Sequence, residues 1–123
     1  MTIAPFAWPL IGVAGAVGAL CRFTLDGAVE NRSDHRFPMG TLCVNLSGAA
    51  ALGLLHGLGV GGSAALLVGT AGLGSYTTFS TLIFETERLL EDDDRLLAAA
   101  NILGSMVLGL NAVVAGWALG GRL

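Results

Sequence analysis

Charged side chains are scarce in this chain. Only 12% of its 123 residues are charged and 54% are hydrophobic, whereas a soluble domain has roughly 25% charged residues. Lysine is absent, since all six basic residues are arginines, and the net charge is −3. No basic surface is available for a nucleic-acid partner. The composition therefore indicates a membrane protein that is surrounded by lipid and has no nucleic-acid partner.

Cysteine and histidine are also rare, with two of each. Cys21 and Cys43 lie in apolar segments and lack the C-x-x-C spacing of a metal or redox site, so we expect small buried packing residues. His35 lies in a charged loop and His56 near the end of an apolar stretch, with no serine or cysteine spaced as a catalytic partner. These absences argue against an enzyme.

Four long apolar stretches make up most of the chain. Each has about the 20 residues that a helix needs to cross the hydrocarbon core, and none alternates with the period of two of a β-barrel strand. They run from about Pro5 to Phe23, Met39 to Gly59, Ala64 to Leu90 and Leu96 to Leu119. No basic residue precedes Arg22, so the first stretch is expected to be a retained span. The sequence predicts an all-α membrane protein with a single four-helix transmembrane domain over residues 1–123.

The third stretch is too long and too polar for a simple helix. It contains GTAGLGSYTT before it resumes as FSTLIFETERLLE, so we expect a break near Gly74 to Thr77. Small residues elsewhere recur every four residues, as in Gly53 with Gly57 and Ser105 with Gly109, which lets helices approach closely in lipid. Four such helices enclose little space of their own. A polar pathway is therefore expected between two subunits.

Polar side chains at membrane depth form faces on three of the four spans. The faces comprise Thr41, Asn45 and Gly48, then Asn101, Ser105 and Gly109, and finally Thr77, Phe79, Ser80 and Thr81. A single asparagine can simply join two helices, but an interhelical hydrogen bond averages only about 0.6 kcal/mol, so three faces need a further reason. Hydroxyl and amide donors, a phenyl ring edge and the start of a helix suit an anion. Carbonyls freed by the break would instead suit a small cation.

Two of these motifs carry a family resemblance. GTLCVNLSG at 40–48, followed by GLGSYTTFST at 72–81 in a four-span chain of this length, resembles the CrcB/Fluc fluoride channels over essentially the whole chain. The resemblance implies an antiparallel, dual-topology dimer that encloses two fluoride pores and holds a structural sodium ion at its centre. It also implies passive export of cytoplasmic fluoride through the cell inner (plasma) membrane.

The resemblance further implies roles for individual residues. Those expected along the fluoride path are Thr41, Asn45, Phe79, Ser80, Thr81 and Ser105. The backbone carbonyls of Gly74 and Thr77 are expected to hold the sodium ion. Glu85 is expected toward the pore mouth, and Arg22 is expected to close the first helix.

Two departures suggest one half of an unequal pair. The family usually reads T-T-F-S-T-F, but here Leu82 replaces the second phenylalanine, and Asn101 stands where a fourth-helix tyrosine is common. Most arginines lie in the loops after the first and third spans, while the opposite side has only Arg122 and the N-terminal amine. The positive-inside rule places those loops in the cytoplasm. We therefore expect a heterodimer with an oppositely oriented paralogue, with a homodimer as the alternative.

Two other functions stay open. A small multidrug-type, proton-coupled exporter also has four short helices, but it needs a carboxylate buried in the membrane. The nearest acids, Asp26 and Glu85, lie toward span ends. A non-conducting partner subunit would tolerate the changes at Leu82 and Asn101, whereas the intact Phe79 argues against it.

Overall fold

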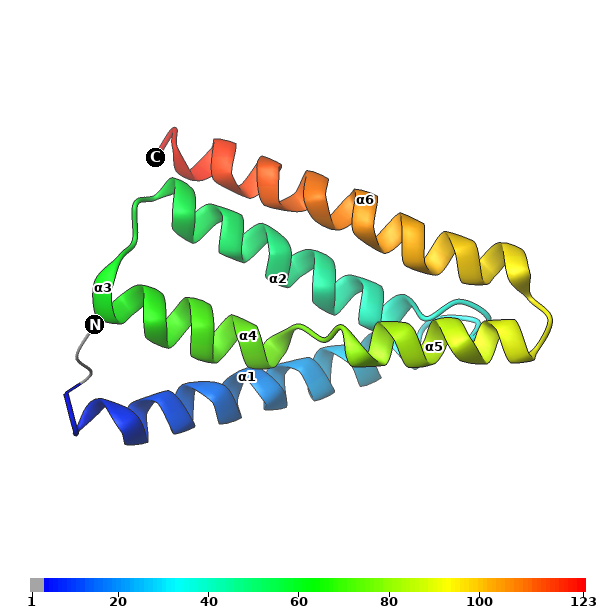
Figure 1. Ribbon diagram of the computed structural model, residues 1–123, viewed down its shortest axis with the longest axis horizontal. Coiled ribbons are helices and arrows are strands. Elements are labelled where there is room, and N and C mark those ends of the chain that lie inside the picture. Colours follow the sequence, from blue (N-terminus) through cyan, green and yellow to red (C-terminus); the bar gives the residue numbers. More distant parts are fainter. Residues whose placement is uncertain (1–3) are drawn as a thin grey trace.

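The computed structural model describes residues 4–123, and no strand occurs among them (Figure 1). Four helical stretches are long and apolar enough to cross a membrane: Ala7–Glu30, Met39–Gly57, Gly62–Glu91 and Arg95–Gly120. The all-helical, four-span prediction is therefore confirmed. The first helix ends at Glu30, well past the predicted end at Phe23, and so includes polar residues beyond the apolar run.

Three of the spans are continuous and the third is divided. The continuous helices are α1 (Ala7–Glu30), α2 (Met39–Gly57) and α6 (Arg95–Gly120). The third span consists of α3 (Gly62–Ala64), the π-helix η1 (Ala65–Leu73), α4 (Gly74–Tyr76) and α5 (Ser80–Glu91). Residues 77–79 connect α4 to α5 without helical structure.

The break begins at the last residue of the range predicted for it, Gly74 to Thr77. Gly74, expected to open it, has helical dihedrals (φ −62°, ψ −36°) and begins α4. The chain leaves the helix at Thr77, where ψ is 158°, and becomes helical again at Ser80. The conformational freedom of glycine is therefore not what ends α4. Side-chain hydrogen bonds, described below, end it instead.

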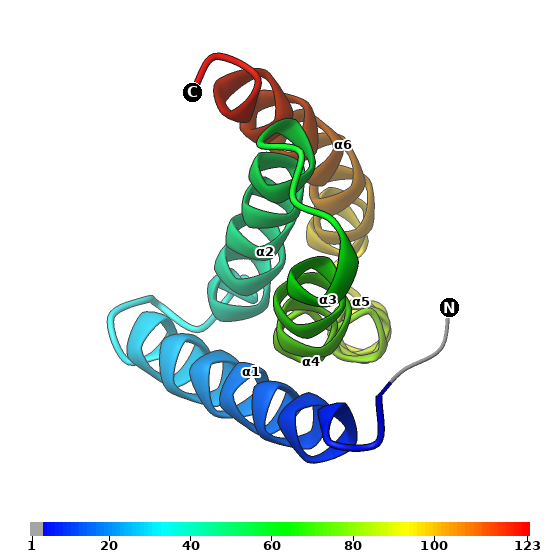
Figure 2. The same ribbon diagram turned by 90° about the vertical axis from the view of Figure 1, so that its left-hand side faces the viewer.

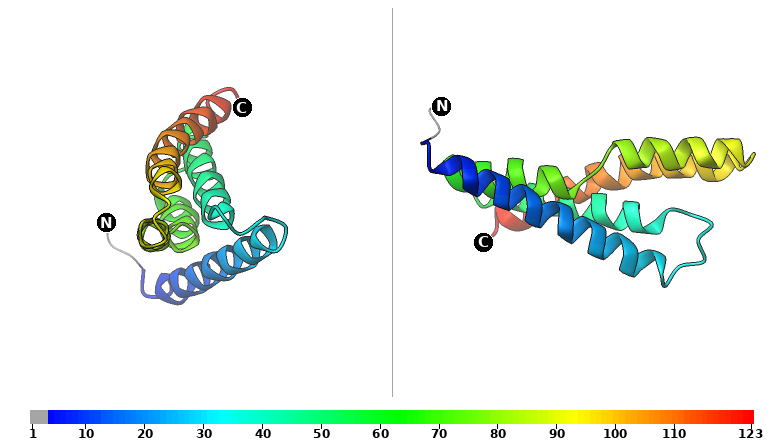
Figure 3. Two further views of the ribbon diagram at one scale, coloured as in Figure 1. Left: turned by 90° about the vertical axis from the view of Figure 1, so that its right-hand side faces the viewer. Right: turned by 90° about the horizontal axis from the view of Figure 1, so that it is seen from below.

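The break changes the neighbour of the third span. Before it, η1 and α4 pack along α1, and beyond it, α5 packs against α6 (Figure 2). Helix α2 contacts α1, α6 and every part of the third span beyond α3. Seen from below, α1 diverges from α5 toward one end of the molecule (Figure 3). The central helix α2 is thus placed to hold both halves of the broken span.

Glycines permit the close approach of α2 and α6. A Cβ atom added at Gly53 would collide with the carbonyl oxygen of Val113, and one at Gly116 would collide with that of Ala50. Gly57 is equally close to the backbone of α6, which confirms the predicted packing by Gly53 and Gly57. Gly109, from the other predicted pair, has open space beside it. The pair Gly53 and Gly57 therefore allows close helix packing within the chain, whereas Gly109 of the other pair does not take part in such packing.

Few apolar side chains are buried within the single chain. The buried hydrophobic residues are Val44, Leu82, Leu89 and Ala98, whereas large hydrophobic side chains are exposed on all four spans. Cys21, expected to be buried, is exposed, and Cys43 is partly exposed. A surface this apolar must be covered by lipid or by another subunit.

Gly116→Ala is expected to lower the free energy of unfolding by roughly 1–3 kcal/mol, because the added methyl group forces α2 and α6 apart. Thermal unfolding of the purified protein in detergent measures the loss. Gly109→Ala is the matched control in the same helix, since its methyl group meets nothing within 4 Å. Equal unfolding midpoints for the two variants would contradict this account of the packing.

Candidate ion pathway at the broken helix

The side chain of Asn45 pairs with the backbone of the break. Its Nδ2 donates to the Thr78 carbonyl oxygen at 2.8 Å, and its Oδ1 accepts from the Thr78 backbone N–H, also at 2.8 Å. Gly48, on the same face of α2, leaves room for the methyl group of Thr77 and the ring of Tyr76. The polar face predicted for α2 thus contacts the broken span, and its asparagine behaves like a neighbouring peptide group.

The hydroxyl of Thr78, one residue before the N-cap residue Phe79, bonds to the first turn of α5. Thr78 Oγ1 accepts from the Thr81 backbone N–H at 3.3 Å and donates to the Thr81 hydroxyl at 3.0 Å, with the Ser80 hydroxyl 3.4 Å away. This contact satisfies one of the free N–H groups in the first turn of α5. Sequence reasoning missed Thr78, which is only 9% exposed. Its spacing of three residues from Thr81, at the start of a helix, is the signal that would have identified this contact.

Phe79 projects from the break into open space. Its side chain is 71% exposed and lines a mainly apolar groove of about 640 Å³ between α2 and the third span. Asn45 and Leu82 line the same groove, although Leu82 is itself only 5% exposed. An aromatic ring beside an open groove at membrane depth is available to a molecule outside the chain.

A smaller cavity of about 110 Å³ lies on the other side of the break. Arg22, Asp26, Thr41, Thr78 and Thr81 are among its lining residues. The cavity is thus lined by residues of α1, α2 and the third span, and Thr78 also lines the apolar groove. Arg22 does not close the first helix as expected, because α1 continues to Glu30.

The other predicted site residues are Thr41 on α2, Glu85 on α5 and Ser105 on α6. Thr41 donates to Oε1 of Glu85 at 2.9 Å, whereas Oε2 of Glu85 is buried and has no hydrogen-bond partner among the described residues. Ser105 Oγ, on α6, is likewise buried without a partner there. Asn101 is 1% exposed and donates to the hydroxyl of Thr86 at 2.9 Å, which joins α6 to α5. Unpartnered buried polar atoms are uncommon, and a bound water or ion is their usual partner.

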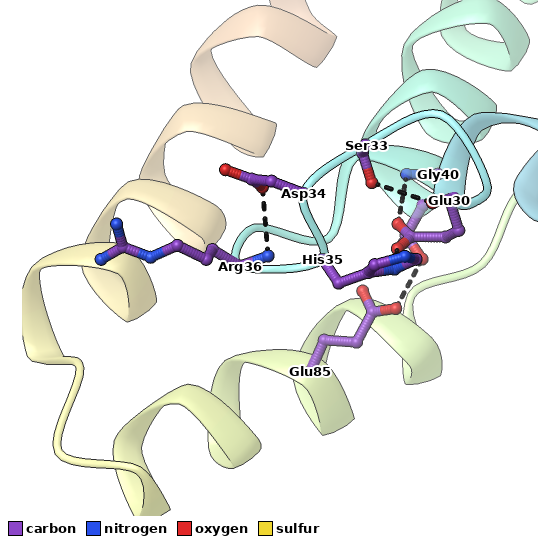
Figure 4. A network of polar contacts seen from close by, with 8 residues as sticks. Glu30, Ser33, Asp34, His35, Arg36, Gly40 and Glu85 are labelled. Atoms are coloured by element: carbon purple, nitrogen blue, oxygen red, sulfur yellow. Dashed lines mark hydrogen bonds and ion pairs between the residues drawn. The ribbon is translucent and has the colours of Figure 1, made fainter.

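A carboxylate holds the start of α2 at one end of the molecule (Figure 4). Oε1 of Glu30 accepts from the Gly40 backbone N–H at 2.9 Å, while His35 Nδ1 lies 3.5 Å from Oε2. Gly40 also packs so closely on Asp26 that any side chain there would collide with it. Glu85 approaches the same region from α5 (Figure 4). Negative charge near the N-terminus of a helix is favourable, so Glu30 fastens the end of α1 to α2.

Comparison with known families identifies the family of this chain. The sequence model described as "CrcB-like protein, Camphor Resistance (CrcB)" matches residues 9–117. The chain belongs to the CrcB/FluC family of fluoride channels. With four helices able to span the membrane, this member is a multi-pass membrane protein. Its family consists of ion channels, which are not enzymes.

Relatives of the CrcB/FluC protein are similar along most of their length. It is 54% identical over 102 residues to "Fluoride-specific ion channel FluC 2" of Mycolicibacterium paratuberculosis, which covers 83% of this chain and 84% of the relative. It is 49% identical over 109 residues to FluC 2 of Mycobacterium tuberculosis, covering 89% and 86%. It is 40% identical over 121 residues to FluC 1 of Frankia casuarinae, covering 91% and 94%.

Glu30→Ala is expected to lower the free energy of unfolding by about 1 kcal/mol, because the Gly40 N–H loses its acceptor. Glu30→Gln, which keeps a neutral acceptor, should lose less. Thermal unfolding at low ionic strength distinguishes the two, and Glu87→Ala, on the exposed side of α5, is the control. The contact contributes nothing if Glu30→Ala and Glu87→Ala unfold at the same temperature.

Proposed function

We propose that this CrcB/FluC protein conducts fluoride passively across the membrane, as one subunit of an antiparallel dimer. The observation that carries the proposal is the break in the third span, which presents the exposed ring of Phe79. The residues on either side of it in sequence, Thr78, Ser80 and Thr81, add hydrogen-bonded hydroxyl groups. Hydroxyl donors and the positive edge of a phenyl ring can replace the water shell of an anion. No acidic residue lies at the centre of a span to couple fluoride movement to a proton gradient. We therefore propose passive conduction and not active pumping.

The donors proposed for the ion are the hydroxyl groups that retain hydrogen-bonding capacity. Thr81 accepts from Thr78 and can still donate, and Ser105 Oγ has no partner among the described residues. Ser80 adds a third hydroxyl at the same helix start. Thr41 directs its hydrogen to Glu85, and we propose that this pair forms part of the pore mouth. Binding at each group must be weak enough for fluoride to leave again.

A second subunit would complete the pathway. The exposed side chain of Phe79 and the open groove beside it need a cover that this chain does not supply. The relatives include proteins named FluC 1 and FluC 2, and these names suggest pairs of paralogues. Since Leu82 lacks a ring and the arginines favour one orientation, we propose an oppositely oriented paralogue as the partner, with the loops after the first and third spans in the cytoplasm.

We extend the proposal to a structural sodium ion. Among the described residues, no hydrogen bond reaches the carbonyl oxygen of Gly74 or of Thr77. Free backbone carbonyls of a broken helix are suitable ligands for a small cation in a membrane, and carbonyls of the second subunit would complete the shell. The residues described here also contain no group of three His, Cys, Asp or Glu side chains that would hold a metal ion. The bound ion would supply a fixed positive charge near the anion path.

A non-conducting partner subunit is the second candidate. Its support comes from Leu82, which offers no ring, and from Asn101, whose amide is directed to Thr86 and not into a path. The exposed ring of Phe79 favours the conducting alternative.

Phe79→Ile is expected to reduce fluoride efflux from liposomes about tenfold when the chain is reconstituted with its paralogue. The loss of one polarised ring edge is worth about 1.4 kcal/mol of barrier at that ratio. The purified chain alone should give little efflux. Robust efflux from the chain alone would overturn the obligate heterodimer, and unchanged efflux after Phe79→Ile would favour the non-conducting subunit.

Leu82→Phe is expected to increase fluoride efflux by the chain reconstituted alone, because it restores a ring beside Phe79. The neighbouring groove provides room for the larger side chain. Leu82→Ile, which changes shape without adding a ring, is the control for repacking. If both variants transport equally, the missing ring is not what limits conduction.

A further inference from the structure

The hydrogen bonds at the break replace two specific bonds of a continuous helix. In an α-helix each backbone N–H pairs with the carbonyl four residues earlier, which would join Thr78 to Gly74 and Thr81 to Thr77. Instead, the Thr78 N–H donates to Asn45 Oδ1 at 2.8 Å, and the Thr81 N–H donates to the Thr78 hydroxyl at 3.3 Å. These replacements leave the carbonyls of Gly74 and Thr77 without their helical partners. Among the described residues, no hydrogen bond reaches the carbonyls of the two residues between them either.

We propose that Asn45 and Thr78 are positioning residues, whose side chains create the break and thereby leave the Gly74 and Thr77 carbonyl oxygens free to bind a cation. This inference rests on the sodium ion of the proposed function. Each side chain takes the N–H group that would otherwise close a helical turn over one carbonyl. Asn45 therefore acts on the cation site through the backbone of Thr78.

The replacement bonds suit a membrane interior, where no water can satisfy a broken helix. Asn45 pairs with both the N–H and the C=O of Thr78, so this peptide position stays satisfied outside the helix. The Thr78 hydroxyl both accepts from the Thr81 N–H and donates to the Thr81 side chain. Removing the Asn45 side chain leaves the Thr78 N–H without an acceptor, and removing the Thr78 hydroxyl does the same to the Thr81 N–H. The nearest helical acceptors are then the carbonyls of Gly74 and Thr77. The continuous helix would then form again over the cation ligands.

Helix α2 also holds the residue before the break. The Ser47 hydroxyl lies 2.7 Å from the Tyr76 hydroxyl, and the Tyr76 ring lies against Gly48. Thr77 is thus held on both sides by α2, through Tyr76 and through Thr78. Its own hydroxyl donates back to the Leu73 carbonyl at 3.1 Å. All these contacts lie within one subunit, so the two carbonyls are arranged before a second subunit arrives, and such preorganisation strengthens binding.

The test compares sodium-dependent stability across matched variants. Asn45→Leu and Thr78→Val remove the two acceptors at similar volume, and Thr78→Ser keeps the hydroxyl. The controls are Asn111→Leu and Thr24→Val, because these side chains only donate to carbonyls of their own helices, at 2.8 Å each. Thermal unfolding of the purified dimer is measured over a range of sodium chloride, with choline chloride keeping the ionic strength constant.

Sodium is expected to raise the unfolding temperature of the wild-type protein. Asn45→Leu and Thr78→Val should raise the sodium concentration for half-maximal stabilisation about tenfold or more, as loss of a group that orients metal ligands does. Thr78→Ser and the two controls should stay within about twofold of the wild type. General destabilisation lowers the unfolding temperature in choline as well and so does not imitate a shifted sodium midpoint.

The outcomes separate this inference from the proposed function. A folded Thr78→Val or Asn45→Leu protein with the wild-type sodium midpoint would overturn the positioning role and leave the sodium ion intact. A wild-type protein with no sodium-dependent stabilisation would overturn the sodium ion, and the positioning role with it. Thr78→Val is the smaller change and decides the question if Asn45→Leu does not fold.

Discussion

The pairing of Asn45 with the backbone of Thr78 is the constraint on which the rest of the structure depends. A helix cannot simply be interrupted in hydrocarbon, because each unpaired peptide group there costs several kcal/mol. The amide of Asn45 removes that cost at one residue, and the Thr78 hydroxyl reduces it at the next turn. The third span can then leave α1 and continue along α6. Without this pairing, a straight third span would hide the polar groups that the break presents.

The position of Asn45 depends in turn on how closely α2 approaches its neighbours. Gly48 lets the break lie directly against α2, and Gly53 and Gly116 bring α6 equally close on another side. Glu30 fixes the start of α2 to the end of α1. Each of these contacts is short because a side chain is missing or because a charge meets a helix terminus. The polar contacts at the break are therefore built on a frame of small residues, not on a large hydrophobic core.

The sequence predicts the spans and the family well, and the details of the break less well. Apolar length follows directly from membrane thickness, so four spans were predictable, and the two motifs identified the family that the comparisons confirm. The sequence predicts a break near Gly74 to Thr77, and the chain leaves the helix at Thr77. The sequence does not indicate, however, that Asn45, distant along the chain, pairs with the next residue, Thr78. Thr78 was missed because only the direction of its hydroxyl distinguishes it from the threonines on either side.

The candidate ion pathway is incomplete in a single chain, and particular residues show what is missing. Buried polar atoms of Glu85 and Ser105 have no partner among the described residues, and Phe79 extends away from the chain. The buried atoms require a hydrogen-bond partner such as a water or an ion, whereas the exposed ring of Phe79 needs lipid or another protein surface to cover it. Two identical subunits would meet this need twice in the same way, each without a ring at Leu82. A paralogue need not repeat that loss, and the departure at Leu82 and the one-sided arginines are the two sequence features on which the proposed unequal pair rests.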